Sequence, residues 1–353
     1  MKKKIVALLL AATMVLGLAA CGNNSNSGST TEASGEKTYN IGILIFNYAN
    51  DYINYVRQGI EKEANALGVK FQSSDAANNQ PTQTEQVDTV LAKGVDGLCV
   101  ALVESTAAST IIEKVQPKNT PVVFVNKQPS PEILNTYDKC WFVGCATKMP
   151  GVQQMEMILD DFQSGALPDK NGDGILQYVI IKGENGHENS EQRLVGYSEV
   201  LKARGLADSY DKYPGFLDLQ VGLWSTQNGK DLMDAWVSKY GDQIEVVISQ
   251  NDAMAFGAIE SIKASSYKIG IYGINALEQA LEKIEAGEMT GTVMTDMIKE
   301  GKITMDVLYN ALKGETDITK GIDATYEKEN KCFRVDTVPI RLSNINDAWY
   351  MYR

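Results

Sequence analysis

The residues whose types and spacing best fit a chemical role form one stretch, residues 169–177, which reads DKNGDGILQ. A calcium loop takes side-chain oxygens at its first, third and fifth positions, glycine at the sixth, a carbonyl at the seventh and an oxygen at the ninth. Here these positions fall on Asp169, Asn171, Asp173, Gly174, Ile175 and Gln177. The spacing predicts a calcium site, although a plain Asp/Asn/Gly surface turn uses the same residue types.

The second half of this loop departs from a helix–loop–helix calcium site. The twelfth position, where a bidentate glutamate is expected, is Ile180. It belongs to the run Gln177 to Ile181, whose β-favouring apolar residues predict a buried strand. Because calcium requires an outer carboxylate, we expect that ligand to come from a distant part of the chain.

The N-terminus has the parts of a secretion signal, with lysines at 2–4, an apolar run at 5–18 and small residues before Cys21. The run Leu18-Ala-Ala-Cys21 resembles a bacterial lipobox, which implies a signal peptide at 1–20 and a diacylglyceryl group on the Cys21 sulfur. An uncleaved membrane helix would need about 20 apolar residues, more than this run provides. The polar tract at 21–38 is expected to be a flexible tether, and no later stretch is apolar enough to span a bilayer.

Composition excludes several classes of protein. A formal net charge of −12 argues against nucleic-acid binding, which requires a basic patch. Nucleophile elbow, P-loop, dinucleotide and zincin motifs are missing, and His187 is the one histidine. A histidine-based zinc cluster is therefore excluded and a catalytic triad disfavoured, so we expect a binding protein rather than an enzyme.

Four cysteines follow Cys21, and none has CxxC spacing. Cys140 and Cys145 lie in one expected strand with side chains on opposite faces, which disfavours a local disulfide. We expect all four, Cys99, Cys140, Cys145 and Cys332, to be buried small hydrophobes.

From residue 39 onward, apolar runs of strand length alternate with segments of helical periodicity. One such series ends near 145 and a second follows, which predicts an α/β fold with two doubly wound parallel-sheet lobes. Ligands of such sheets bind beyond the carboxyl ends of the strands. The residues at those ends are Phe46, Asn50, Tyr52, Asn126, His187, Asn251 and Asn275.

Residues 39–335 resemble the periplasmic galactose/glucose-binding proteins, of the type I family that supplies ABC importers. The motifs that carry the resemblance are Ile41-Gly-Ile, Leu91-Ala-Lys-Gly94, Pro121-Val-Val-Phe-Val-Asn-Lys127, Lys182-Gly-Glu-Asn-Gly-His187, Met233-Asp-Ala-Trp236, Glu245-Val-Val-Ile248, Asn251-Asp-Ala-Met254 and Gly291-Thr-Val293. The resemblance implies a monomer whose lobes, 39–145 with 295–333 and 146–294 with 334–353, are joined by a three-segment hinge. It also places the missing calcium carboxylate on Glu245.

The resemblance implies a sugar site in the cleft between the lobes. Five positions match the family: Asn126, His187, Arg193, Trp224 and Asn251. Six positions differ from the family. This chain has Phe46 where the family has Tyr, Tyr52 where it has Phe, Asn50, Asn189 and Asn275 where it has Asp, and Thr295 where it has Asn. Tyr52 and Trp224 are expected to sandwich the pyranose. For Trp224 the alternative is core packing, but its setting in the loop-like run Gly222-Leu-Trp-Ser-Thr226 favours the site. Without the resemblance, His187 indicates an exposed turn and Arg193 a solvated helix face.

The implied function is capture of galactose or glucose and delivery to an ABC permease, by a protein anchored through its lipid on the outer face of the cytoplasmic membrane. Replacement of three Asp by Asn also suggests an acidic sugar such as a uronate, unless Glu188 or Asp51 restores the negative charge. A sugar sensor for a receptor is a further alternative. Cys145 and Cys332 both lie at expected lobe crossings, where either a disulfide or free thiols are compatible with the sequence.

Overall fold

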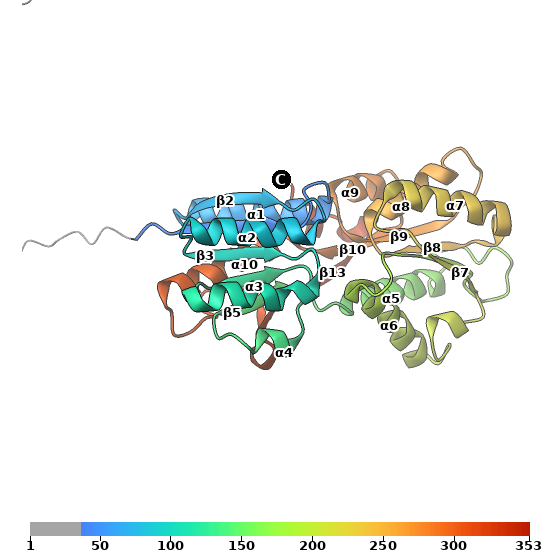
Figure 1. Cartoon of the computed structure of the whole chain (residues 1–353). Coiled ribbons are helices and arrows are strands. Elements are labelled where there is room, and N and C mark those ends of the chain that lie inside the picture. The colour runs from blue at the N-terminus through green and yellow to red at the C-terminus, as the bar shows by residue number, and fades with distance from the viewer. Residues whose placement is uncertain (1–36) are drawn as a thin grey trace, which may run out of the picture. The chain divides into compact units, whose positions relative to one another are not determined.

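The structure, a computed structural model, describes residues 37–353, so the expected signal peptide at 1–20 and Cys21 lie outside the described residues. Strands and helices alternate along the described chain and form two sheets of mostly parallel strands with helices on both faces (Figure 1). This arrangement confirms the predicted fold class. Between residues 37 and 353, no helix is both long and apolar enough to cross a bilayer.

The first sheet has seven strands in the order β11-β12-β5-β4-β3-β1-β2, parallel except for β11. Its strands are β1 (Asn40–Ile45), β2 (Lys70–Asp75), β3 (Gly97–Ala101), β4 (Val122–Val125), β5 (Cys140–Gly144), β11 (Thr325–Glu327) and β12 (Cys332–Arg334). Its helices are α1 (Asp51–Ala66), α2 (Gln80–Ala92), α3 (Ala108–Val115), α4 (Pro131–Leu134) and α10 (Met297–Lys313).

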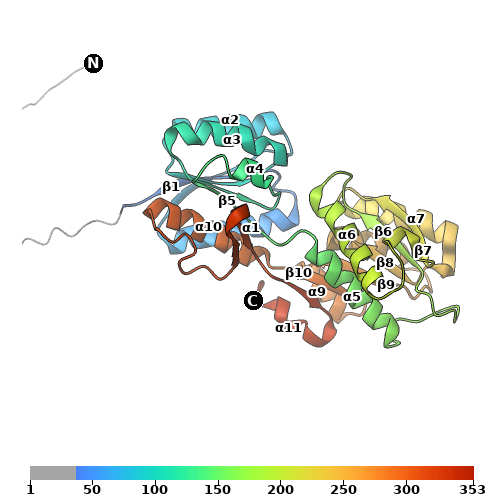
Figure 2. The same ribbon diagram turned by 90° about the horizontal axis from the view of Figure 1, so that it is seen from below.

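Both faces of the first sheet are buried, which explains why its strands read as continuous apolar runs. In β1, Ile41, Ile43 and Ile45 face the core that contains α1 and α10, whereas Leu44 faces the core under α2 and α3. Figure 2 shows α2 and α3 on one side of β1 and β5, and α1 and α10 on the other.

The second sheet has six strands in the order β13-β10-β9-β8-β6-β7, with β13 antiparallel at its edge. Its strands are β6 (Tyr178–Lys182), β7 (Phe216–Val221), β8 (Val246–Ser249), β9 (Gly270–Asn275), β10 (Gly291–Thr295) and β13 (Thr337–Ile340). Its helices are α5 (Met149–Gln163), α6 (Glu188–Ala203), α7 (Thr226–Tyr240), α8 (Asp252–Ile262) and α9 (Glu278–Glu285), and the short α11 (Asn346–Trp349) follows β13.

The chain passes between the two sheets three times. It crosses from β5 to α5, from β10 of the second sheet to α10 against α1 of the first, and from β12 to β13. The crossing helix α10 is fixed by direct backbone contact with α1. A Cβ added to Gly59 would lie 2.5 Å from the Ile298 carbonyl oxygen, and one added to Gly301 would lie 2.2 Å from the Val56 carbonyl oxygen.

Some elements, or parts of elements, were not predicted from the sequence. Strand β7 lies at the sheet edge, and its residues are mostly half-buried, so its apolar signal is weak. Strand β2 extends to Asp75 through polar residues that pair with β1. The long helix α10 follows β10 after Asp296 alone, so no run of turn residues separates strand from helix.

Candidate functional site

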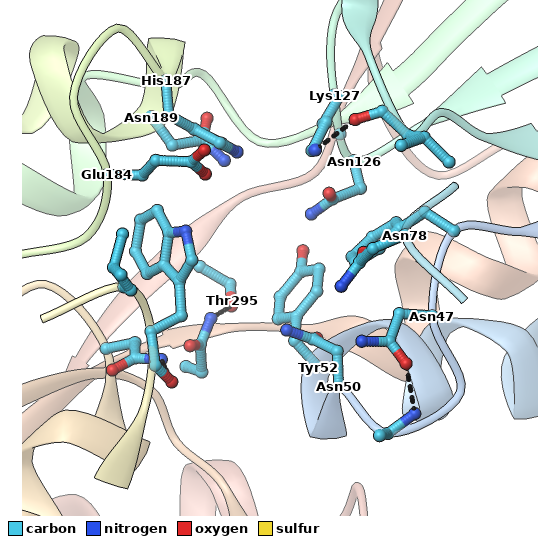
Figure 3. Close-up of a pocket in the computed structure, with 18 of the residues that line it drawn as sticks. Asn47, Asn50, Tyr52, Asn78, Asn126, Lys127, Glu184, His187, Asn189 and Thr295 are labelled. Atoms are coloured by element: carbon cyan, nitrogen blue, oxygen red, sulfur yellow. Dashed lines mark hydrogen bonds between the residues drawn. The ribbon is translucent and has the colours of Figure 1, made fainter. Parts of the chain in front are cut away.

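A cavity of about 620 Å³ is lined by residues of both sheets, mainly from the loops that follow strand carboxyl ends. Figure 3 shows Glu184, His187 and Asn189 on one side, Asn126 and Lys127 on the other, and the Tyr52 ring projecting between them. All eleven residues predicted for the sugar site line this cavity: Phe46, Asn50, Tyr52, Asn126, His187, Asn189, Arg193, Trp224, Asn251, Asn275 and Thr295.

The first sheet contributes the loop between β1 and α1. The side-chain oxygen of Asn50 caps α1 by accepting a hydrogen bond from the Ile53 amide at 3.1 Å. Tyr52 follows in the first turn and is half-buried, so its ring faces the cavity from α1. Asn126, directly after β4, adopts a φ of 72°, a left-handed conformation that asparagine tolerates better than most residues.

The second sheet contributes Trp224, whose indole lies directly over Gly183. A Cβ added to Gly183 would lie 2.0 Å from the ring, so only glycine leaves room for the indole there. Leu223 and Trp224 both adopt positive φ, 51° and 61°, which lifts this segment out of the preceding strand direction. The His187 ring meets the Trp224 ring edge-on with centroids 5.2 Å apart. Trp224 is therefore a cavity wall rather than a core residue.

Arg193 is 5% exposed and lies on α6, with its guanidinium 5.9 Å from the Trp224 ring centroid. One terminal nitrogen donates to the Gln250 carbonyl, whereas Nε has no hydrogen-bond partner among the described residues. Burial lowers the pKa of Arg193, and the Cys145 thiol and nearby tyrosines oppose that shift. A donor that is desolvated and incompletely paired is suited to a ligand oxygen.

His187 carries no charge at neutral pH in this environment. Burial, followed by the nearby Lys127 and Arg193 cations, lowers the pKa of His187 to about 4. Its Nδ1 is buried and has no partner within residues 37–353. A neutral imidazole offers the cavity one donor and one acceptor.

The remaining amides are held by the second sheet. Asn251 caps α8 by accepting from the Met254 amide at 2.9 Å, and its amide nitrogen donates to the Trp224 carbonyl at 3.4 Å. Asn275 has a φ of 128° and donates to the Thr295 hydroxyl at 3.0 Å. Because backbone and neighbours fix these amides, the hydrogen-bonding pattern that they present is set before a ligand enters.

Several cavity residues were missed in the sequence. Lys127, Glu104 and Glu184 follow strands β4, β3 and β6, so the strand-end rule would have found them. Glu300, in the first turn of α10, also lines the cavity and carries no sequence signal. The expected sources of negative charge, Glu188 and Asp51, are not among the residues that line the cavity.

The four cysteines Cys99, Cys140, Cys145 and Cys332 are free. Cys332 pairs with Phe142 across β12 and β5, and Cys145 lies beyond the end of β5, so the disulfide alternative is wrong. Three of the thiols are buried as expected. Cys145 differs, because it is half-buried and lines the cavity, where burial raises its pKa to about 11 and keeps the thiol protonated.

The loop at 169–177 folds around its own oxygens. The two Asp169 carboxylate oxygens accept from the Gly172 and Gly174 amides at 2.8 Å. Both glycines have positive φ, 73° and 74°, which the turn requires. Asp173 accepts from the Ile175 amide at 2.8 Å, which turns the chain toward β6.

Glu245 reaches this loop from the start of β8, as the resemblance implies. It is 1% exposed, and its two oxygens accept from the backbone amides of Lys170 at 2.6 Å and Gln177 at 3.0 Å. The Asn171 and Gln177 side chains donate to Asp173 at 2.9 Å each. Among the described residues, no group of three or more His, Cys, Asp or Glu side chains lies close enough together to hold a metal ion.

The donor set nevertheless fits calcium, which takes six to eight oxygens from carboxylates, amides and carbonyls. Two of the expected ligands are amides and one is a backbone carbonyl, so a cluster of acidic side chains alone would not describe the site. The amide groups of Asn171 and Gln177 can present oxygen instead of nitrogen by a half-turn. Calcium binding stays a prediction.

Residues 41–316 match the family model described as a periplasmic binding protein domain. The chain is 36% identical over 309 residues to the D-galactose/methyl-galactoside binding periplasmic protein MglB of Haemophilus influenzae, with 87% of this chain and 91% of the relative covered. It is 28% identical to the xylitol-binding protein of Mycolicibacterium smegmatis, with 88% and 81% covered.

Solved structures share the fold at lower identity. A Bacillus halodurans ABC transporter solute binding protein with bound myo-inositol has a TM-score of 0.72 at 24% identity, covering 90% of this chain and all of that one. An Actinobacillus succinogenes periplasmic solute binding protein with bound D-allose has a TM-score of 0.74 at 18% identity, covering 88% of this chain and all of that one. By its two-sheet fold and by these matches, the chain belongs to the type I periplasmic binding proteins.

Proposed function

We propose that this protein captures a monosaccharide of the galactose or glucose type in its cavity and delivers it to an ABC permease. The observation that carries the proposal is a cavity that combines the Trp224 and Tyr52 rings with the amides of Asn126, Asn251 and Asn275. The C–H faces of a pyranose are apolar and its rim is all hydroxyl, so rings and amides complement its two kinds of surface. Two relatives bind galactosides and xylitol respectively, which supports a polyhydroxylated solute.

The charges that line the cavity favour a neutral solute over a uronate. Lys127 and Arg193 are cationic, and Glu104 and Glu184 bring two carboxylates that were not predicted to line the cavity. Burial raises the pKa of Glu300 to about 8, so this third acid is mostly neutral at pH 7. The lining is thus close to charge balance, which removes the expected excess of positive charge.

A uronate is the second candidate, and one observation favours it. The buried Arg193 guanidinium has an Nε without a partner in the described part of the chain. A ligand carboxylate would pair with a guanidinium through two parallel hydrogen bonds and remove that deficit. A sugar hydroxyl would satisfy the same nitrogen with a single neutral acceptor.

In the proposed mechanism the two lobes close on the solute about the three crossings between the sheets. Ligand contacts from both sheets would be completed only in the closed form, so binding shifts the equilibrium toward closure. We further propose that the closed monomer docks on the permease. Lipid on Cys21 would hold the protein at the outer face of the cytoplasmic membrane, with two or more acyl chains for stable anchoring.

We propose a structural calcium ion held by Asp169, Asn171, Asp173, Gln177 and Glu245, together with the Ile175 carbonyl. When bound, the ion would cross-link the loop before β6 to the start of β8. Support comes from the Glu245 carboxylate, which is buried yet already fixed to two loop amides.

Calorimetry with galactose, glucose, galacturonate and glucuronate tests the proposed function. We expect binding of a neutral hexose with negative heat-capacity change from the buried ring contacts. Tight uronate binding without hexose binding would favour the second candidate. Absence of any binding, together with no sugar released on denaturing the purified protein, would refute a sugar-binding role.

A further inference from the structure

Glu300 is a buried acid with one satisfied and one unsatisfied oxygen. Its side chain is 2% exposed, and Oε2 accepts a hydrogen bond from the Tyr52 hydroxyl at 2.7 Å. Oε1 has no hydrogen-bond partner anywhere in residues 37–353. Most buried polar atoms in proteins are paired, so a buried oxygen without a partner needs a specific explanation.

Close backbone packing of α10 against α1 fixes the position of Glu300. It directly precedes Gly301, at the point where α10 contacts α1 too closely for any Cβ. Tyr52 lies on that same helix α1, so the helix contact holds hydroxyl and carboxyl together. A rotation of the carboxyl other than a half-turn would break the Tyr52 bond.

The missing partner of Oε1 is most simply found in the cavity. Glu300 lines it together with Tyr52, Cys145 and Thr295. The half-buried Cys145 is a weak donor and acceptor, and Thr295 is already the acceptor for Asn275. A solute hydroxyl entering between these residues would meet a carboxyl oxygen that has nothing else to bind.

We propose that Glu300, oriented by Tyr52, is a specificity-determining residue whose free oxygen hydrogen-bonds one hydroxyl of the bound solute. This inference rests on the proposed function, because it assumes a polyhydroxylated ligand. The carboxyl is protonated at neutral pH, since burial raises its pKa, and Oε1 then donates to the solute oxygen. An amide at the same position would also donate, whereas an apolar side chain would not.

The test compares Glu300→Met with Glu300→Gln by calorimetry at pH 7. The probe is whichever of D-galactose, D-glucose and myo-inositol binds the wild-type protein most tightly. We expect Glu300→Met to weaken binding about 10- to 100-fold, because a buried ligand hydroxyl loses its partner. Glu300→Gln should stay within about threefold of wild type. Glu282→Met, the same substitution at an exposed glutamate outside the cavity, is the matched control.

Monodeoxy analogues of the same probe separate direct contact from a structural role. If Glu300 contacts one hydroxyl, the Glu300→Met penalty should disappear for the analogue that lacks it and persist for the others. An equal penalty for every analogue, or none for the parent sugar, would overturn the inference. Glu300→Met leaves the Tyr52 hydroxyl without its partner, so the double variant Tyr52→Phe/Glu300→Met removes that hydroxyl as well. Its melting temperature and its residual binding show whether lost folding explains the penalty.

Failure of the proposed function is distinguishable from failure of this inference. If the wild-type protein binds none of the three probes, the proposal of a neutral hexose or polyol as solute fails and the role of Glu300 falls with it. If the wild-type protein binds and Glu300→Met binds equally well, only the role of Glu300 is refuted.

Discussion

Replacing Glu300 with glutamine should change how the stability of the protein depends on pH. In the folded chain, burial raises the pKa of Glu300 from 4.5 to about 8, and Asp296 on the same helix adds to the increase. The Tyr52 hydrogen bond opposes it and is too weak to offset burial. No cation contributes to this shift, so the folded state holds a proton that the unfolded state releases above pH 4.5.

The sign and size of the effect follow from proton linkage. Between pH 4.5 and 8 the folded state binds more protons than the unfolded state, so this group's contribution to stability falls as pH rises. Over pH 5 to 9 the loss is on the order of 4 kcal/mol. Glutamine does not titrate, so the free energy of unfolding of Glu300→Gln should rise by that amount relative to wild type between pH 5 and pH 9. For a chain of this size that is about 6 °C in melting temperature.

Differential scanning calorimetry of both proteins without added sugar, at intervals from pH 5 to 9, measures this difference. The control is Glu282→Gln, at an exposed position of α9, where the difference from wild type should stay flat. A difference between Glu300→Gln and wild type that does not change with pH would refute the reasoning. It would mean that Glu300 ionises in the folded protein as it does in water.

Three further predictions concern other parts of the chain. Gly183→Ala should weaken sugar binding by at least tenfold by calorimetry, because its methyl group would occupy the position of the Trp224 ring; unchanged affinity would contradict the wall assignment. EDTA should lower the melting temperature, because calcium at a hundredfold excess over its Kd stabilises the folded protein by about 2.7 kcal/mol; the Glu245→Ala variant should not respond to EDTA. An unchanged melting curve, with metal removal verified by elemental analysis, would refute the calcium site. His187→Gln should lose less stability than wild type as pH falls from 6.5 toward 4, because below pH 6.5 His187 takes up a proton in the unfolded state that it excludes when buried. Parallel curves of stability against pH for the variant and wild type would show that His187 titrates freely.

Periodicity in the sequence was enough to predict the two-sheet fold, because strands buried on both faces must be apolar throughout. The strand-end rule then located Phe46, Asn126 and Asn251, whose cavity positions depend on sheet topology alone. Arg193 could not be placed that way. A single arginine on a helix normally lies in water, and only the packing of α6 against the cavity shows that this one is buried.

Glu300 marks the limit of sequence reasoning. It lies in the first helical turn after strand β10, and nothing in its local sequence distinguishes it from a solvated glutamate. Its burial depends on the glycine contact between α1 and α10, which brings together residues 248 positions apart, as the Tyr52 bond shows. The cavity charges were misjudged for a related reason, since Glu104 and Glu184 gather there only through the arrangement of two sheets.

Two of the three crossings between the sheets carry residues that line the cavity. Gly144 and Cys145 follow β5, and Thr295 ends β10 immediately before α10. A solute that contacts Thr295 and Glu300 would therefore touch both ends of one crossing, separated by a single helical turn. Torsional change at Asp296, which caps α10 through the Lys299 amide at 2.9 Å, would alter the distance between those two contacts. The backbone torsions that set the spacing of the two ligand contacts would then also set the arrangement of the lobes. A solute that fits only one spacing of Thr295 and Glu300 would therefore select one lobe arrangement directly.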